Sequence, residues 1–145
     1  MGKGKTLHKI NVLAILSFFA ITAITFFKSA LELEDAEQAY YSQWLRWGYD
    51  DQPPLYTWLQ YGFNTVFGVG KLAFSLLRAV LFAGTLLLLY RFSGLRIKEA
   101  DTSKLAVLAL VLIPVYIDFT FRRLSHTSLL CLCVVASYYS IQLLL

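Results

Sequence analysis

Three carboxylates and two tyrosines stand close together in one short stretch of the sequence. Glu34, Asp35 and Glu37 are followed directly by Tyr40 and Tyr41. A carboxylate can accept the proton of a hydroxyl group that attacks an activated carbon, and aromatic faces can stack on sugars or cover a lipid chain. The alternative is structural, because Asp35 can cap a helix while the rings lie at a membrane surface. Both interpretations stay open on the residues alone.

Two short helices are expected to carry these residues. Asp35 is the expected cap of the first, with Gln38 in the capping-box position and an end near Gly48. Pro53-Pro54 suits the first turn of the second, and apolar residues follow helical spacing from there to Phe67. The many aromatic side chains predict that both helices are amphipathic and lie at the membrane–water boundary.

Basic residues mark two further places where an anion can bind. Arg78 interrupts an apolar run, and an arginine inside a span indicates either a functional site or a salt bridge between helices. Arg122, Arg123 and His126 form the second candidate site, suited to a lipid phosphate. The alternative there pairs Arg122 with Asp118, leaves Arg123 at lipid headgroups and makes the histidine structural.

The composition predicts an integral membrane protein that is entirely helical. Of the 145 residues 58% are hydrophobic and 15% are charged, with a mean hydropathy of +0.61. Soluble domains carry about 25% charged residues, and disordered chains have few aromatic residues where this one has 16%. Four apolar stretches are long enough to cross a membrane. The spans are expected at residues 10–28, 72–91, 104–120 and 124–145.

The distribution of lysine and arginine predicts the orientation of these spans. Basic residues cluster before the first span and in the stretch that separates the second span from the third. The positive-inside rule therefore places both ends in the cytoplasm and residues 29–71 on the outer face of the membrane. A bacterial inner membrane is the expected location, and the loop is then periplasmic or extracellular. The net charge of +4 serves orientation here, and no nucleic-acid partner is expected.

The order of these features is similar to the beginning of a GT-C class glycosyltransferase of the protein-mannosyltransferase and aminoarabinose-transferase type. In that family an acidic pair follows the first span, and a Tyr-rich helix, a Gly-Tyr turn, a Pro-Pro-Leu motif and a span with an arginine come next. The matching features are Glu34-Asp35, Tyr40-Tyr41, Gly48-Tyr49, Pro53-Pro54-Leu55 and Arg78. The resemblance covers nearly the whole of residues 1–145, and it implies the N-terminal part of a GT-C transmembrane domain.

The resemblance implies an inverting transfer of a sugar from a polyprenyl-phosphate donor to a glycan, lipid or protein acceptor on the outer face. The family's general base corresponds to Asp35, with Glu34 next because the pair is reversed here. Glu37 is expected to hold a partner side chain or a divalent cation, and no other cofactor is implied. Substrate binding is expected to involve Tyr40, Tyr41, Pro53, Pro54, Tyr56, Arg78, Arg122, Arg123 and His126.

Length separates this chain from the family. Its members are several times longer, so we expect the 145 residues to be an N-terminal piece that has no transferase activity alone. The alternative function is a small non-catalytic membrane protein with four helices, either a subunit or an assembly factor. A small transporter ranks last, because the carboxylates cluster outside the spans rather than within them.

Overall fold

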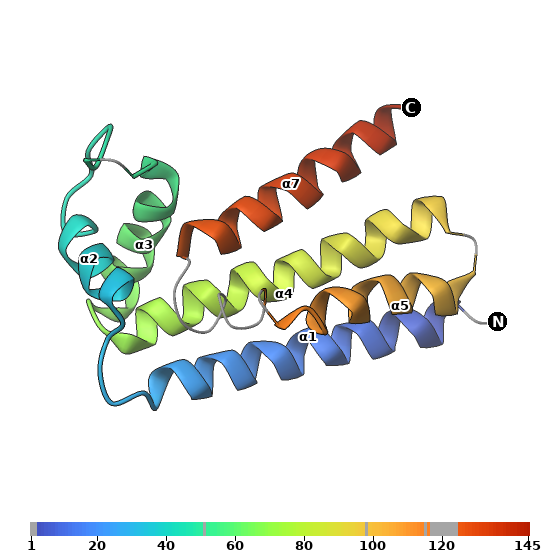
Figure 1. Ribbon diagram of the computed structural model, residues 1–145, viewed down its shortest axis with the longest axis horizontal. Helices are drawn as coiled ribbons and strands as arrows, with labels where there is room; N and C mark the ends of the chain where they lie inside the picture. The colour runs from blue at the N-terminus through green and yellow to red at the C-terminus, as the bar shows by residue number, and fades with distance from the viewer. Residues whose placement is uncertain (1–2, 51, 98, 115, 117–124) are drawn as a thin grey trace.

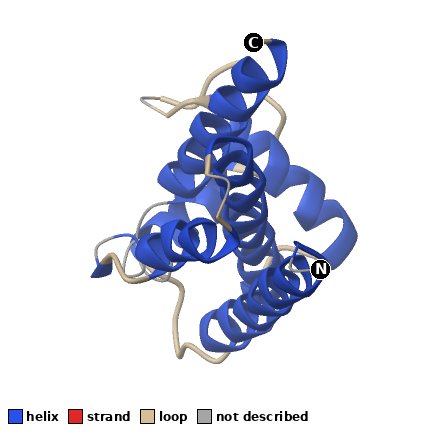
Figure 2. Ribbon diagram, turned by 90° about the vertical axis from the view of Figure 1, so that its right-hand side faces the viewer, coloured by secondary structure: helices blue, strands red, loops and turns tan. Residues whose placement is uncertain are grey.

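The described part of the chain consists of helices and loops, which confirms the expected all-helical class. The computed structural model describes residues 3–50, 52–97, 99–114, 116 and 125–145, with no strand among them. Figure 2 shows the helices and the loops that connect them. The helices are α1 (Lys3–Phe26), α2 (Leu33–Tyr41), α3 (Pro54–Phe67), α4 (Lys71–Arg96), α5 (Ala100–Val111) and α7 (Ser125–Leu144).

Helix α4 is the centre of a bundle of long helices. Figure 1 shows α1 and α5 along one side of α4 and α7 along the other, and all three pack against it. The core where α1, α4 and α5 meet is apolar. In lipid such a core is stabilised by van der Waals contacts between closely packed side chains. Its buried members are Ile10, Ile21, Ala79, Phe82, Leu86 and Val107.

Two of the four expected spans meet the length and composition of a membrane-crossing helix. They are Lys71–Arg96 and the stretch His126–Leu144 of α7, among the residues described. The apolar part of α1, Ile10–Phe26, is shorter than the usual length of about 20 residues. The expected third span, 104–120, begins in α5 and continues into residues outside the described part. The arrangement with four spans therefore stays a prediction.

Helices α2 and α3 form a small unit at one end of the bundle, where α3 packs against α4 (Figure 1). The predicted start of α3 is confirmed, since Pro53 is its extended N-cap residue and Pro54 its first helical residue. The predicted end is confirmed as well. Gly68 follows Phe67 with a φ of 77°, a left-handed conformation that glycine adopts without steric cost.

The predicted ends of α2 are wrong. Glu32 is the N-cap residue, without a side-chain hydrogen bond to the helix, and Asp35 lies inside the first turn. The helix ends at Tyr41 rather than near Gly48, because the chain turns at Ser42, whose backbone N–H bonds to the carbonyls of Gln38 and Tyr40. The structural interpretation of Asp35 as a helix cap is thereby excluded.

Helices α2 and α3 bury several polar side chains, and α3 leaves several apolar side chains exposed. Gln60 Nε2 donates to Asn64 Oδ1 at 2.8 Å, and Asn64 Nδ2 donates to Ser42 Oγ at 2.7 Å, with all three residues buried. The exposed residues of α3 include Leu55, Leu59, Val66 and Phe67. These bonds pair several buried polar groups with one another, as an apolar environment demands, while Gln60 Oε1 has no hydrogen-bond partner among the described residues.

Candidate active site

A buried ion pair joins the α2–α3 unit to the bundle. Arg78 Nη2 donates to Asp35 Oδ1, although the two residues are 43 positions apart. Asp35 is 2% exposed and Arg78 is 1% exposed. Arg78 was predicted either to bind an anion in a functional site or to form a salt bridge between helices. In the structure it pairs with Asp35, the predicted general base.

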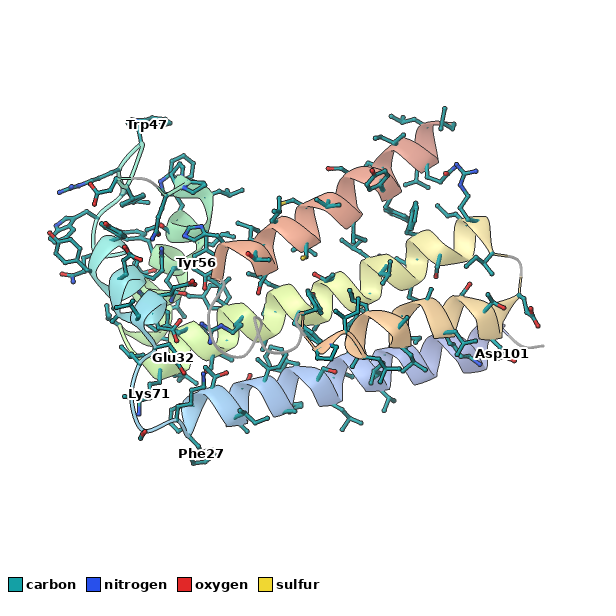
Figure 3. The ribbon with its side chains drawn as sticks, in the orientation of Figure 1. Phe27, Glu32, Trp47, Tyr56, Lys71 and Asp101 are labelled. Carbon is teal, nitrogen blue, oxygen red and sulfur yellow. The ribbon has the colours of Figure 1, made fainter. Side chains whose placement is uncertain are left out.

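The position of this pair follows from how the segments are connected. Asp35 is the third residue of α2, and Arg78 lies seven residues after Lys71, where α4 begins. Lys71 Nζ donates to the carbonyl oxygen of Lys28 at 2.6 Å, and Lys28 forms a salt bridge with Glu32 at 3.2 Å. Figure 3 shows Phe27, Glu32 and Lys71 at the same end of the bundle. These contacts hold the connection between α1 and α2 against the start of α4.

The electrostatics of Asp35 combine two opposing effects. Burial raises the pKa of the Asp35 carboxyl above its ordinary value, because the charged form loses its hydration. The guanidinium of Arg78 opposes that rise by charge and by hydrogen bond, and Lys28 adds a smaller effect in the same direction. A carboxylate with a raised pKa is a stronger base than one in water.

A second polar cluster lies where α2, the start of α3 and the start of α7 meet. His126 Nε2 lies 2.9 Å from Gln52 Oε1 and 3.1 Å from Gln38 Nε2, and Gln38 also donates to Gln52. Thr57 Oγ1 donates to Gln38 Oε1 at 3.0 Å. The buried Gln38 amide is therefore bonded on both sides, which is what a buried amide requires.

The cluster reaches one of the predicted carboxylates. Gln52 Nε2 donates to Glu37 Oε2 at 2.7 Å, so that Glu37 is joined to His126 through the Gln52 amide. In this structure the Glu37 carboxylate is thus bonded to the side chain of Gln52. No group of three or more His, Cys, Asp or Glu residues suited to a metal occurs within the described ranges. The divalent cation stays a prediction.

A hollow of about 260 Å³ opens beside this cluster, between the beginnings of α3 and α7. The rings of Tyr56 and His126 lie against one another there, with centroids 5.1 Å apart, and Figure 3 shows Tyr56 near the start of α7. Its described lining is uncharged, which suits an apolar or neutral part of a ligand. That lining is Pro53, Leu55, Tyr56, His126, Thr127, Leu129, Leu130 and Cys133.

The remaining predicted residues divide between the surface and the undescribed part. Glu34 is half-buried on α2 and Pro54 is half-buried at the start of α3. Tyr40 is 59% exposed and packs against Tyr41, whose hydroxyl donates to Asp50. Arg122 and Arg123, like their expected partner Asp118, lie outside the described residues. His126 was expected beside those arginines and a phosphate, and the structure places it with two amides.

Gln38, Gln52 and Thr57 were missed as members of the site. Gln38 was assigned to a helix cap, and an amide in a loop such as Gln52 belongs to no motif. One available signal was the spacing of Thr57, Gln60 and Asn64, which places three polar side chains on one face of α3. In a helix whose other face contacts lipid, such a polar face is expected to turn toward the rest of the protein.

Comparisons with known proteins agree on the kind of protein. The family model described as dolichyl-phosphate-mannose-protein mannosyltransferase matches residues 51–145. The lipopolysaccharide core galacturonosyltransferase RgtB of Rhizobium johnstonii is 38% identical over 98 residues, which are 68% of this chain and 20% of RgtB. The lipopolysaccharide core galacturonosyltransferase RgtA of the same organism is 35% identical over 105 residues, 70% of this chain and 20% of RgtA.

The chain spans about one fifth of the length of these two curated relatives. No solved structure matches it. The family match begins at residue 51, so that it includes Arg78 and His126 but not the carboxylates of α2. The pairing of Asp35 with Arg78 therefore connects the segment before the match to the segment within it.

Proposed function

The chain belongs to the dolichyl-phosphate-mannose-protein mannosyltransferase family of GT-C class glycosyltransferases, and we propose that its site transfers a sugar from a polyprenyl-phosphate donor. The transfer takes place on the outer face of the membrane, onto a glycan, lipid or protein acceptor. The observation that carries the proposal is the buried Asp35–Arg78 pair, which sets a carboxylate and a phosphate-binding group side by side. The names of RgtA and RgtB support a uronic acid as the sugar and a lipopolysaccharide core as the acceptor.

In the proposed reaction Asp35 is the general base. Its carboxylate takes the proton of the acceptor hydroxyl as the hydroxyl oxygen forms a bond to the anomeric carbon of the donor sugar. The bond between that carbon and the phosphate oxygen breaks, and polyprenyl phosphate leaves with the electron pair. Attack from the side opposite to the phosphate inverts the configuration at the anomeric carbon.

Arg78 has two successive partners in this proposal. Before the donor binds, its guanidinium pairs with Asp35. A donor phosphate competes for the same guanidinium, because phosphate and carboxylate bind arginine through similar geometry. When Arg78 turns to the phosphate it neutralises the leaving group, and Asp35 loses the charge that limits its pKa. Donor binding thus strengthens the base.

The proposed membrane arrangement has four spans, at residues 10–28, 72–91, 104–120 and 124–145. Both ends lie in the cytoplasm of a bacterial cell and the α2–α3 unit lies at the outer surface of the inner membrane. Helix α3 supports this placement, because it has no charged residue and turns several apolar side chains outward. The exposed face of α7 in the structure supports contact with lipid or with further helices.

Single amide substitutions test the base. The open reading frame that holds this sequence is expressed to its own stop codon, and transfer from a polyprenyl-phosphate sugar is measured for Asp35→Asn, Glu34→Gln and Glu37→Gln. We expect Asp35→Asn to lower kcat by roughly 10²–10⁴-fold, the usual contribution of a general base, and Glu34→Gln to keep most of it. The 145-residue chain alone is expected to give no turnover.

Asp35→Asn also removes the carboxylate that pairs with the buried guanidinium of Arg78, so loss of folding has to be separated from loss of the base. The double variant Asp35→Asn/Arg78→Met removes both charges and should restore the amount of folded protein without restoring transfer. Full activity in Asp35→Asn would overturn the proposal. The pair would then be structural, and another group would serve as the base.

A further inference from the structure

All three tryptophans of the chain lie in one region of the α2–α3 unit. Trp44 and Trp47 belong to the connection between the two helices, and Trp58 belongs to α3. The rings of Trp47 and Trp58 meet nearly at right angles, with centroids 5.8 Å apart. Trp47 is 92% exposed, and Figure 3 shows it at the tip of the unit, away from Lys71 and Phe27. A large apolar ring in this position is available to a ligand.

Hydrogen bonds fix the loop that carries these rings. The indole Nε1 of Trp58 donates to the carbonyl oxygen of Arg46 at 2.8 Å, and the Arg46 backbone N–H donates to the Tyr49 hydroxyl at 2.9 Å. That hydroxyl in turn donates to the carbonyl oxygen of Trp44, and Tyr49 is 3% exposed. The Trp58 indole and the backbone that carries Trp44 and Trp47 are therefore fixed before any ligand arrives, which lowers the entropic cost of binding.

One cation lines the hollow beside these rings. The hollow measures about 460 Å³, and its described lining is Leu45, Arg46, Trp47 and Trp58. The Arg46 guanidinium lies over the Trp44 ring, 5.4 Å from its centroid, which orients the charge. Asp50, an acidic residue of the same loop, accepts a hydrogen bond from the Tyr41 hydroxyl on α2. The described lining thus combines aromatic faces with one positive charge.

We propose that Arg46, Trp47 and Trp58 bind an acidic sugar of the acceptor glycan. The apolar face of a pyranose ring packs on an indole, and a guanidinium binds a carboxylate or phosphate through two hydrogen bonds. This inference rests on the proposed function, since it names where the acceptor of that reaction is held. It makes Arg46 a recognition group that acts apart from the Asp35–Arg78 pair.

A lipid contact is the competing explanation of exposed tryptophans, and the charges of the loop argue against it. The exposed face of α3 carries apolar side chains such as Leu55 and Val66. The loop instead exposes Gln43, Arg46 and Asp50 around its rings. Exposed charged groups such as Arg46 and Asp50 are costly in lipid and favour a surface in contact with water, where a glycan can reach it.

Intrinsic tryptophan fluorescence tests this site directly, because every tryptophan of the chain lies in or beside it. The chain is placed in nanodiscs of zwitterionic lipid and titrated with an oligogalacturonide, and in parallel with a neutral galactose oligomer of equal length. We expect a saturable change of emission with the acidic oligomer alone, weakened by added salt. Arg46→Gln should weaken that binding at least tenfold, and Trp47→Ala should weaken it similarly.

Arg96→Gln is the matched control, because Arg96 is an exposed arginine at the far end of α4 and should leave the titration unchanged. A second set of nanodiscs contains brominated phospholipid. Quenching by that lipid without a saturable response to the acidic oligomer would overturn the site in favour of a membrane contact. Equal responses to acidic and neutral oligomers would overturn the role of Arg46. Binding is read without turnover, so failure of Asp35 as the base would leave this result intact.

Discussion

The amide nitrogen of Gln38 lies 3.1 Å from Nε2 of His126, although 88 residues separate the two in the sequence. This contact joins the α2–α3 unit to the first turn of α7, whose own surface is largely exposed. Together with the Asp35–Arg78 pair on α4, it attaches helix α2 to two of the long helices.

Removing either side of the Gln38–His126 contact should loosen α7. We expect Gln38→Ala and His126→Ala each to lower the free energy of unfolding by about 1–3 kcal/mol, because each leaves a buried polar partner unsatisfied. The double variant should cost less than the sum, giving a coupling energy of roughly 0.5–3 kcal/mol in unfolding experiments on the chain in detergent. Ser137→Ala, at an exposed position of α7, is the control and should change stability by less than about 0.5 kcal/mol. Strict additivity of the two effects would contradict the contact.

The Asp35–Arg78 pair should show the asymmetry of a buried ion pair. Arg78→Met alone leaves the Asp35 carboxylate without its strongest partner, and we expect a loss of about 3–5 kcal/mol of stability. Asp35→Asn/Arg78→Met should recover most of that loss, because two neutral side chains of similar size need no hydration. Thermal unfolding of the purified chain measures both. Equal stability of the single and double variants would show that burial does not govern this pair.

The sequence pointed to Asp35 and Arg78 as functional residues but did not predict that they touch, and the reason is geometric. The motif order pointed to Asp35 and Arg78 separately, one as a base and the other beside a phosphate. Their contact depends on how α2 folds back over α4 after a sharp connection at residues 27–32, and no local pattern encodes that path. Pro53-Pro54, by contrast, fixes the start of α3 through backbone conformation alone, and its prediction was confirmed.

The end of α2 shows the same difference. Gly48 is a good helix terminator in sequence, yet the helix stops seven residues earlier. The buried Ser42 hydroxyl donates to the Gln38 carbonyl oxygen and accepts from Asn64 of α3. The residue that follows the end of α2 is thus bonded to Asn64, which lies 22 residues further along the chain. Local helix propensity does not include such a tertiary contact.

The rate of transfer should depend on pH through Asp35. Its folded pKa lies above 3.8, because burial outweighs the effects of Arg78 and Lys28. The folded state therefore holds this proton more tightly than the unfolded state, so the Asp35 contribution to stability is present below pH 3.8 and is lost as pH rises through the folded pKa. Activity runs in the opposite direction, since only the carboxylate accepts a proton.

We therefore expect kcat/KM, which reports the free enzyme with Asp35 still paired to Arg78, to rise with pH on an acid limb whose midpoint lies above 3.8. In Arg78→Met that limb should move further toward neutral pH, because the guanidinium that lowers the Asp35 pKa is gone. A pH–rate profile of each protein, with unfolding monitored at every pH, measures the shift. An unchanged midpoint in Arg78→Met would mean that another group controls the acid limb.

Gly84 provides a test of how closely α7 packs on α4. A Cβ atom built at Gly84 would lie 3.3 Å from Leu132 Cδ1, so alanine requires only a small movement of that flexible methyl group. Gly84→Ala should change stability by less than about 1 kcal/mol, since alanine is also the better helix former.

Gly84→Leu overfills the contact, and we expect it to cost about 1–3 kcal/mol in thermal unfolding. Truncating the opposing side chain in Gly84→Leu/Leu132→Ala should return much of that loss. A Cβ atom built at Gly94 on the same helix meets nothing within 4 Å, so Gly94→Leu serves as the control for leucine in α4. A loss in Gly94→Leu as large as that in Gly84→Leu would show that the helix itself, and not its contact with α7, is sensitive to the added side chain.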